Sequence, residues 1–172
     1  MDFSYIQNVL FEMGKFVFIS NFILLLIAVM FERKVSSVVI SLMVLALASG
    51  VMSAATPMLY SWSIKPGILN KFAWYGSFAF VDCMALYLLF KFHKLLKQHI
   101  SKVAQVVGSA FLIFTMLQSA RFIDRYVLNT DLLSAIYHNV IPALNLVLVP
   151  MIVFFWLSER RVKKTVMTEA MQ

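Results

Sequence analysis

The sequence predicts an all-α polytopic integral membrane protein, a compact bundle of five transmembrane helices. Hydrophobic residues make up 62% of the 172 residues and charged ones only 13%, whereas charged residues are about 25% of a soluble domain. The charges gather in short clusters, and five charge-poor apolar runs lie between them. A water-soluble domain of this length could not bury so much apolar surface. We therefore expect lipid to surround most of the chain.

The apolar runs set the expected helices, because a spanning helix needs about 20 residues at a rise of about 1.5 Å each. Four runs carry no charge, and the third is interrupted only by Asp82. We expect a single domain over residues 1–172, with no soluble domain. Residues 1–13 mix apolar and polar positions, which favours the membrane interface. The expected helices are residues 14–31, 35–60, 71–95, 102–126 and 132–157.

Charged and turn-forming residues separate these helices. Glu32-Arg33-Lys34 joins the first two as a tight hairpin, and Lys65-Pro66-Gly67 is a turn signal before the third. Asn129-Thr130-Asp131 supplies good cap residues for the fifth helix. Proline cannot donate a hydrogen bond to the preceding turn, so we expect Pro57 to kink or end the second helix.

The distribution of Lys and Arg predicts the orientation, because short cytoplasmic loops carry an excess of both. One side would hold ten basic residues: Arg33, Lys34, Lys91, Lys94, Lys97, Lys102, Arg160, Arg161, Lys163 and Lys164. The other side would hold five: Lys15, Lys65, Lys71, Arg121 and Arg125. We expect a bacterial inner-membrane protein with its N-terminus outside and its C-terminus in the cytoplasm.

The expected cytoplasmic side presents a basic inner surface. Attraction to anionic lipids, about 1 kcal/mol per basic residue, accounts for it without a protein partner. A cytosolic protein partner is the alternative. The net charge of +7 does not indicate nucleic-acid binding, because the basic residues lie at the ends of membrane segments. This surface comprises Lys91, Lys94, Lys97, Arg160, Arg161, Lys163 and Lys164.

Small residues recur at every fourth position of the second expected helix, at Ala46, Gly50 and Ala54. This pattern lets two helix backbones approach closely in lipid. We expect these residues at a close helix–helix contact. Packing within one subunit and a seam between subunits are both open.

Asp82 is the one acid well inside an expected span. A charged side chain at the bilayer centre costs at least about 2.5–3.5 kcal/mol, so Asp82 should face the bundle and be hydrogen-bonded. The expected partners form an intramembrane polar cluster with it: Gln118, Arg121, His138, Asn145 and Asn21. A structural carboxyl and a functional one are both open. For Arg121 the alternative is a solvated salt bridge to Asp124 at a helix end.

No catalytic or cofactor-binding motif occurs in the sequence. It lacks the HExxH pattern, a phosphate-binding loop and a nucleophile elbow. Cys83 is the single cysteine, so no internal disulfide forms. We expect no catalytic residue, no metal site, no cofactor and no nucleic-acid partner.

The leading functional hypothesis is a small non-enzymatic membrane protein that acts through assembly. It would be a homo-oligomer, or the membrane subunit or sensor of a complex. Bacterial defence and immunity systems use small membrane proteins of this general kind, which is an analogy without a motif. The rival is a small channel or transporter, proton-linked through Asp82 and His138. An intramembrane enzyme is a third hypothesis and would need a second polar group beside one of these two residues.

Overall fold

The computed structural model confirms an all-helical chain with five helices long and apolar enough to cross a membrane. It describes residues 3–169, and it describes side-chain surroundings for residues 12–137 and 139–161. No strand occurs within residues 3–169. The helices are α1 (Phe3–Glu32), α2 (Ser37–Ser63), α3 (Ile68–Leu95), α4 (Lys102–Tyr126) and α5 (Ser134–Glu169).

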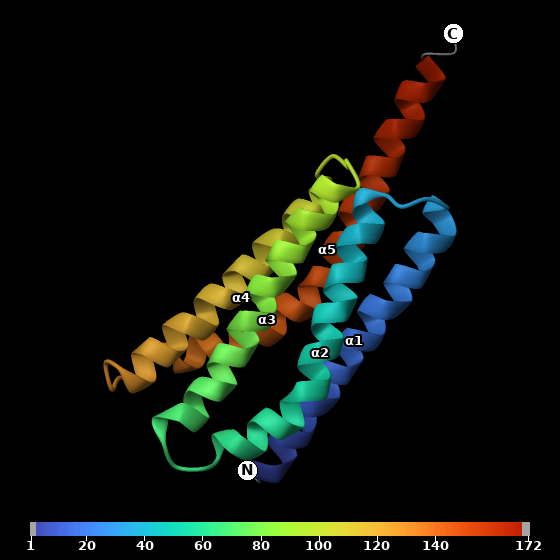
Figure 1. Cartoon of the computed structure of the whole chain (residues 1–172). Coiled ribbons are helices and arrows are strands. Elements are labelled where there is room, and N and C mark those ends of the chain that lie inside the picture. The colour runs from blue at the N-terminus through green and yellow to red at the C-terminus, as the bar shows by residue number, and fades with distance from the viewer. Residues whose placement is uncertain (1–2, 170–172) are drawn as a thin grey trace.

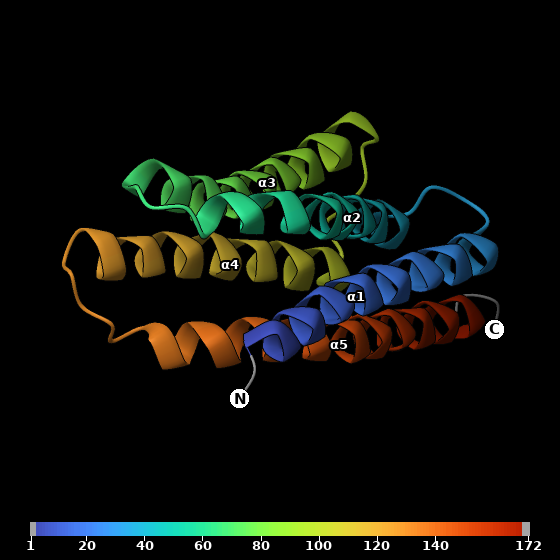
Figure 2. The same ribbon diagram turned by 90° about the horizontal axis from the view of Figure 1, so that it is seen from below.

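Short connections force successive helices to run antiparallel, so all five lie roughly side by side (Figure 1). Each helix packs on the next in the chain, α1 also contacts α5, and α2 contacts α4 across the middle. Figure 2 shows the result as three levels, with α3 on one face, α2 and α4 between, and α1 and α5 on the other face. The helix α3 packs on the middle pair and meets α5 through the rings of Tyr75 and Tyr137 at one end of the bundle.

The two ends of the bundle are built differently. The C-terminal end holds the α1–α2 and α3–α4 connections, and the N-terminal end holds the α2–α3 and α4–α5 connections (Figure 1). Most buried apolar side chains lie toward the C-terminal end, among them Ala28, Val38, Leu42, Leu89, Val103, Val107, Ile152 and Trp156. Toward the N-terminal end, α2, α3, α4 and α5 instead meet through aromatic rings, including Tyr60–Trp74, Phe72–Phe122 and Tyr75–Tyr137.

Several helix boundaries differ from the sequence prediction, three of them with consequences for the fold. The expected interface segment is part of α1, which begins at Phe3. Pro57 lies inside α2, which continues to Ser63. The helix α5 continues to Glu169, well past the expected end at residue 157. Hydropathy marks the apolar segment that fits the bilayer and not the full helix, so it gave no signal for these extensions.

Candidate functional site

Asp82 faces the interior of the bundle, as predicted. Its side chain lies on α3 and is only 1% exposed. Neither carboxylate oxygen has a hydrogen-bond partner among the described residues, however, so the prediction is wrong for Gln118, Arg121, Asn145 and Asn21. A buried polar group without a partner is rare in folded proteins and calls for an explanation. Asp82 is therefore the leading candidate for a functional group inside the membrane region.

The residues predicted to join Asp82 do not form one cluster, because each described member is engaged elsewhere. Gln118 accepts from the Tyr137 hydroxyl at 2.8 Å. Asn145 donates to the Ile141 carbonyl of its own helix at 3.1 Å. Asn21 donates to Ser49 Oγ at 3.4 Å, and Arg121 pairs with Asp124 and Asp131. The side chain of His138 lies outside the described residues.

The order of the helices explains why Asn21 and Asn145 do not bond Asp82. Asn21 and Asn145 lie on α1 and α5, whereas the helices that pack along α3 are α2 and α4 (Figure 2). Gln118 lies on the neighbouring α4 and bonds Tyr137 instead. Depth in the membrane can be read from sequence spacing, whereas the order of helices around the bundle cannot. Asn21 Oδ1 is likewise buried without a described partner.

Arg121 is the centre of an ionic cluster at the N-terminal end, in which Arg121 and Asp124 are buried and Asp131 is exposed. Its guanidinium donates to Asp124 Oδ2 at 2.8 Å and to Asp131 Oδ1 at 2.5 Å. Asp124 also accepts from the Thr130 hydroxyl and from the backbone N–H of Leu133. These bonds hold the α4–α5 connection against the end of α4, up to the residue that precedes α5.

The sequence predicted the Arg121–Asp124 pair from helical spacing but described it as solvated. That description is wrong, since Arg121 is 1% and Asp124 4% exposed. The cause is the α4–α5 connection, which folds back over the pair and places Asp131 and Thr130 on it. Thr130 and Asp131 were predicted as cap residues of α5, but their side chains bond Asp124 and Arg121 instead. Asp124 accepts from the backbone N–H of Leu133, the residue just before α5.

The sequence did not predict a buried polar network at the C-terminal end. His93 Nε2 lies 2.7 Å from Ser37 Oγ, and His93 Nδ1 donates to the Leu89 carbonyl at 2.7 Å. Ser37 Oγ also bonds Ser101 Oγ at 2.9 Å and accepts from the Ser101 backbone N–H at 3.0 Å. The network joins α2, α3 and the start of α4. Its members are far apart in the chain, so no local pattern could have revealed it.

The Ser37–His93 spacing is that of a nucleophile and its base. A hydroxyl offers one hydrogen and two acceptor positions, however, and here His93 and Ser101 use all three. His93 is 4% exposed and Ser37 is 7% exposed. These contacts fit a bond between helices, and they leave no free lone pair for attack on a substrate.

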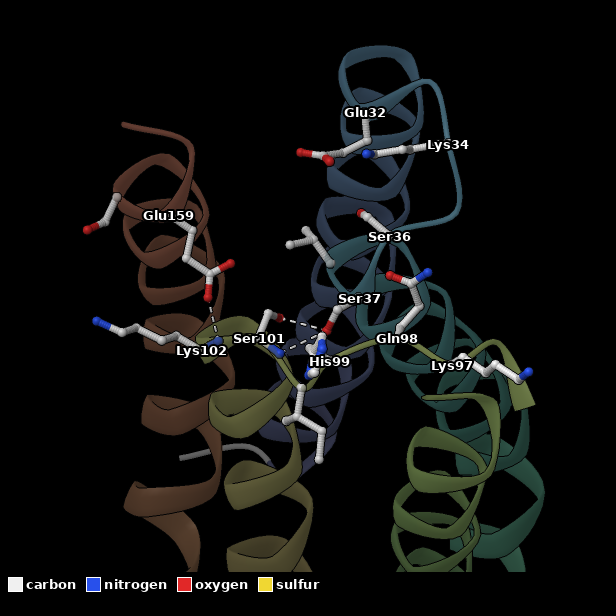
Figure 3. Close-up of a pocket in the computed structure, with 13 residues that line it drawn as sticks. Glu32, Lys34, Ser36, Ser37, Lys97, Gln98, His99, Ser101, Lys102 and Glu159 are labelled. Carbon is white, nitrogen blue, oxygen red and sulfur yellow. Dashed lines mark hydrogen bonds between the residues drawn. The ribbon is translucent and has the colours of Figure 1, made fainter. Parts of the chain in front are cut away.

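A pocket of about 500 Å³ opens beside this network (Figure 3). Glu159 of α5 accepts from the Lys102 backbone N–H at 2.5 Å, and Trp156 Nε1 donates to Glu32 at 2.9 Å. Figure 3 shows the Lys97 and Lys102 side chains extending in opposite directions, away from Ser37. Lys97 and Lys102 therefore do not converge on one anion.

The predicted basic inner surface lies around this same end. Lys91, Lys94 and Lys97 of the α3 end are exposed, as are Arg160 and Arg161 of α5. Arg160 also lies over the rings of Phe31 and Trp156, at 5.2 and 5.7 Å from their centroids. Lys163 and Lys164 lie outside the residues whose side chains are described.

The small residues of α2 do not share one environment. Ala46 is buried, and a Cβ atom added to Gly50 would lie 2.9 Å from Phe18 Cε2 of α1. Ala54 is exposed. Two of the three positions therefore face other helices of the same chain.

Among the described residues, no group of three His, Cys, Asp or Glu side chains is placed to hold a metal ion. Comparison of the chain with protein-family models, curated proteins and solved structures found no match.

Proposed function

We propose that this chain is a small non-enzymatic membrane protein that acts through assembly with other membrane helices. The proposed setting is a bacterial inner membrane with the C-terminal end in the cytoplasm, based on the ten-to-five basic asymmetry. All four connections between helices are short. Contacts with a partner must then use helix surfaces within the membrane, the two bundle ends, or the end of α5 that extends past the other helices (Figure 1).

The observation that carries this proposal is a line of exposed polar side chains on α4. Gln105, Ser109 and Ser119 are exposed, and none of their side chains has a hydrogen-bond partner in the described part of the chain. Several other hydroxyls within the spans bond a carbonyl of their own helix, as Thr56 and Thr115 do. Exposed polar groups that face lipid favour association with another helix, which supplies hydrogen bonds that lipid tails cannot.

Assembly predicts a particle heavier than one 19.7 kDa chain. We expect native mass spectrometry from lipid nanodiscs to show two or more copies, or one copy with a second protein retained from the native membrane. The control is the same preparation in a strongly dissociating detergent, where single chains should dominate. A single chain in nanodiscs, together with no cross-linked partner in native membranes, would contradict the proposal.

Asp82 supports a second candidate function, a proton-linked channel or transporter. Its carboxylate is buried without a described partner, and ionisable groups inside membrane helices mark ion pathways and proton relays. A carboxylate that held helices together would need a donor from a neighbour. The absence of such a donor among the described residues favours a group that binds a transported proton.

We expect Asp82→Asn to abolish proton flux without lowering the melting temperature, because the wild-type carboxylate has no described hydrogen bond to lose. Flux would be measured in proteoliposomes that contain a pH-sensitive dye, with a potassium gradient and valinomycin as the driving force. Glu12→Gln, at an exposed carboxylate, is the matched control. Wild-type flux equal to that of protein-free vesicles, or equal flux in Asp82→Asn, would exclude this candidate.

A further inference from the structure

Six of the exposed residues of α4 follow a heptad repeat, while Lys102, Ile113 and Arg125 are exposed beside them. Successive members are spaced by four, three, four, three and four positions, which is the 3.5-residue period of a left-handed coiled-coil seam. Leu112, Met116 and Ile123 are 47%, 60% and 48% exposed. We name this surface the exposed α4 face and define it as Gln105, Ser109, Leu112, Met116, Ser119 and Ile123.

The exposed α4 face lies at the depth of the lipid tails. Phe114 is the middle residue of α4, and Ser109 and Ser119 each lie five positions from it. Five positions correspond to about 7.5 Å, and the hydrocarbon core extends about 15 Å to each side of its centre. Both hydroxyls are therefore inside the hydrocarbon, where an unpaired polar group is unfavourable.

We propose that the exposed α4 face binds the same face of a second copy of this chain, in a parallel dimer with a two-fold axis along the membrane normal. This inference rests on the proposed function and names the partner and surface for it. Two copies inserted with the same topology are parallel. In a parallel heptad seam each core position meets its own counterpart.

Self-pairing is favoured by the chemistry of the polar side chains. A serine hydroxyl both donates and accepts, and so does a glutamine amide. Ser109, Ser119 and Gln105 can each bond their own counterpart without any unpaired charge. Leu112, Met116 and Ile123 alternate with them and supply packing between the two helices. Polar core positions also fix the register of such a pair.

The exposed faces of α2 and α5 lack this combination. The exposed face of α2 carries Met43, Leu47, Val51 and Met58, and that of α5 carries Leu146, Met151 and Phe154. These side chains are apolar, and lipid tails solvate them fully. Ser61 of α2 is exposed, but its hydroxyl donates to the Met58 carbonyl at 2.7 Å. The exposed α4 face thus differs from the exposed faces of α2 and α5 in carrying several polar side chains without a described hydrogen-bond partner.

Single-cysteine cross-linking in native membranes tests the pairing. The sole cysteine would first be removed as Cys83→Ser, and one cysteine then placed by Ser109→Cys, Met116→Cys or Ser119→Cys. We expect oxidation to give disulfide-linked dimers from these three variants and not from Leu47→Cys or Leu146→Cys. Serine and cysteine are close in size, so the two serine variants should leave the fold unchanged.

A second measurement needs no cysteine. The double variant Ser109→Ala, Ser119→Ala should weaken dimerisation about threefold to tenfold, measured by energy transfer on lipid dilution in liposomes. Ser61→Ala is the matched control and should leave dimerisation unchanged. Unchanged dimerisation in the double variant would overturn the hydrogen-bonded seam.

The outcomes separate this inference from the proposed function. Disulfide dimers through Leu47→Cys or Leu146→Cys alone would place the interface elsewhere and overturn the inference while assembly stands. Cross-links from α4 to a different protein would overturn the second copy as the partner. Single chains without cross-links at any of the five positions, and without a second protein, would overturn both.

Discussion

Arg121→Ala is expected to lower the melting temperature by about 5–10 °C, because it leaves Asp124 buried without its cation. Asp124 is 4% exposed and would keep only the Thr130 hydroxyl and the Leu133 backbone N–H as donors. Asp131 would lose the same guanidinium. The α4–α5 connection would then lose the group that orders it. Thermal unfolding followed by tryptophan fluorescence in mild detergent measures the change.

Two variants show whether the effect comes from the cluster and not from charge alone. Arg125→Ala removes an exposed arginine of the same helix end and should change the melting temperature little. Arg121→Lys keeps the charge but not the planar guanidinium that bonds Asp124 and Asp131 together. Its melting temperature should therefore lie between those of the wild type and Arg121→Ala. Equal melting temperatures of Arg121→Ala and Arg125→Ala would show that the buried Arg121–Asp124 pair does not order the N-terminal end of the bundle.

The fold class was predictable from one physical constraint, the length of apolar chain that a bilayer requires. A bilayer requires about 20 apolar residues per span, and the chain contains five such runs separated by charges. The structure accordingly has five helices at the expected places. Helix ends were less predictable, since hydropathy marks the membrane and not the helix. Thus α1 begins before its apolar run and α5 continues after its own.

The candidate site was predictable in part. The cost of a charge in lipid predicts that Asp82 faces the bundle, and it does. Its surroundings depend on which helices are neighbours, and the sequence holds no direct signal for that order. The Arg121–Asp124 pair followed from the three-residue spacing within one helix. The Ser37–His93 bond joins different helices and was missed for the same reason as the surroundings of Asp82.

These observations place different kinds of groups at different depths of the bundle. Toward the C-terminal end, apolar packing and the Ser37–His93 network hold the helices together. Toward the N-terminal end, aromatic rings and the Arg121 cluster do so. Asp82 has no described hydrogen bond, so it contributes none to this framework. A residue that can be changed without loss of a described contact is well suited to a functional test.

Gly50→Leu is expected to destabilise the protein by about 1–3 kcal/mol through overpacking between α1 and α2. Even a Cβ atom at this position would lie 2.9 Å from Phe18 Cε2 and 3.2 Å from Phe18 Cδ2. A leucine side chain must push the phenyl ring of Phe18 out of the groove or separate the two backbones. Gly14→Leu is the matched control on the same pair of helices, because a Cβ there meets nothing nearer than Ser53 Oγ at 3.9 Å.

A double-mutant cycle isolates the Gly50–Phe18 contact. Phe18→Ala alone should destabilise the protein by loss of packing, but in the Gly50→Leu background the leucine can fill the space that the ring leaves. The double variant should therefore be more stable than the sum of the two single effects predicts, with a coupling of about 1 kcal/mol or more. Strict additivity of the free energies of unfolding of the four proteins would show that the effect of Gly50→Leu does not depend on the Phe18 ring. The small residue would then be free to serve a contact outside the chain.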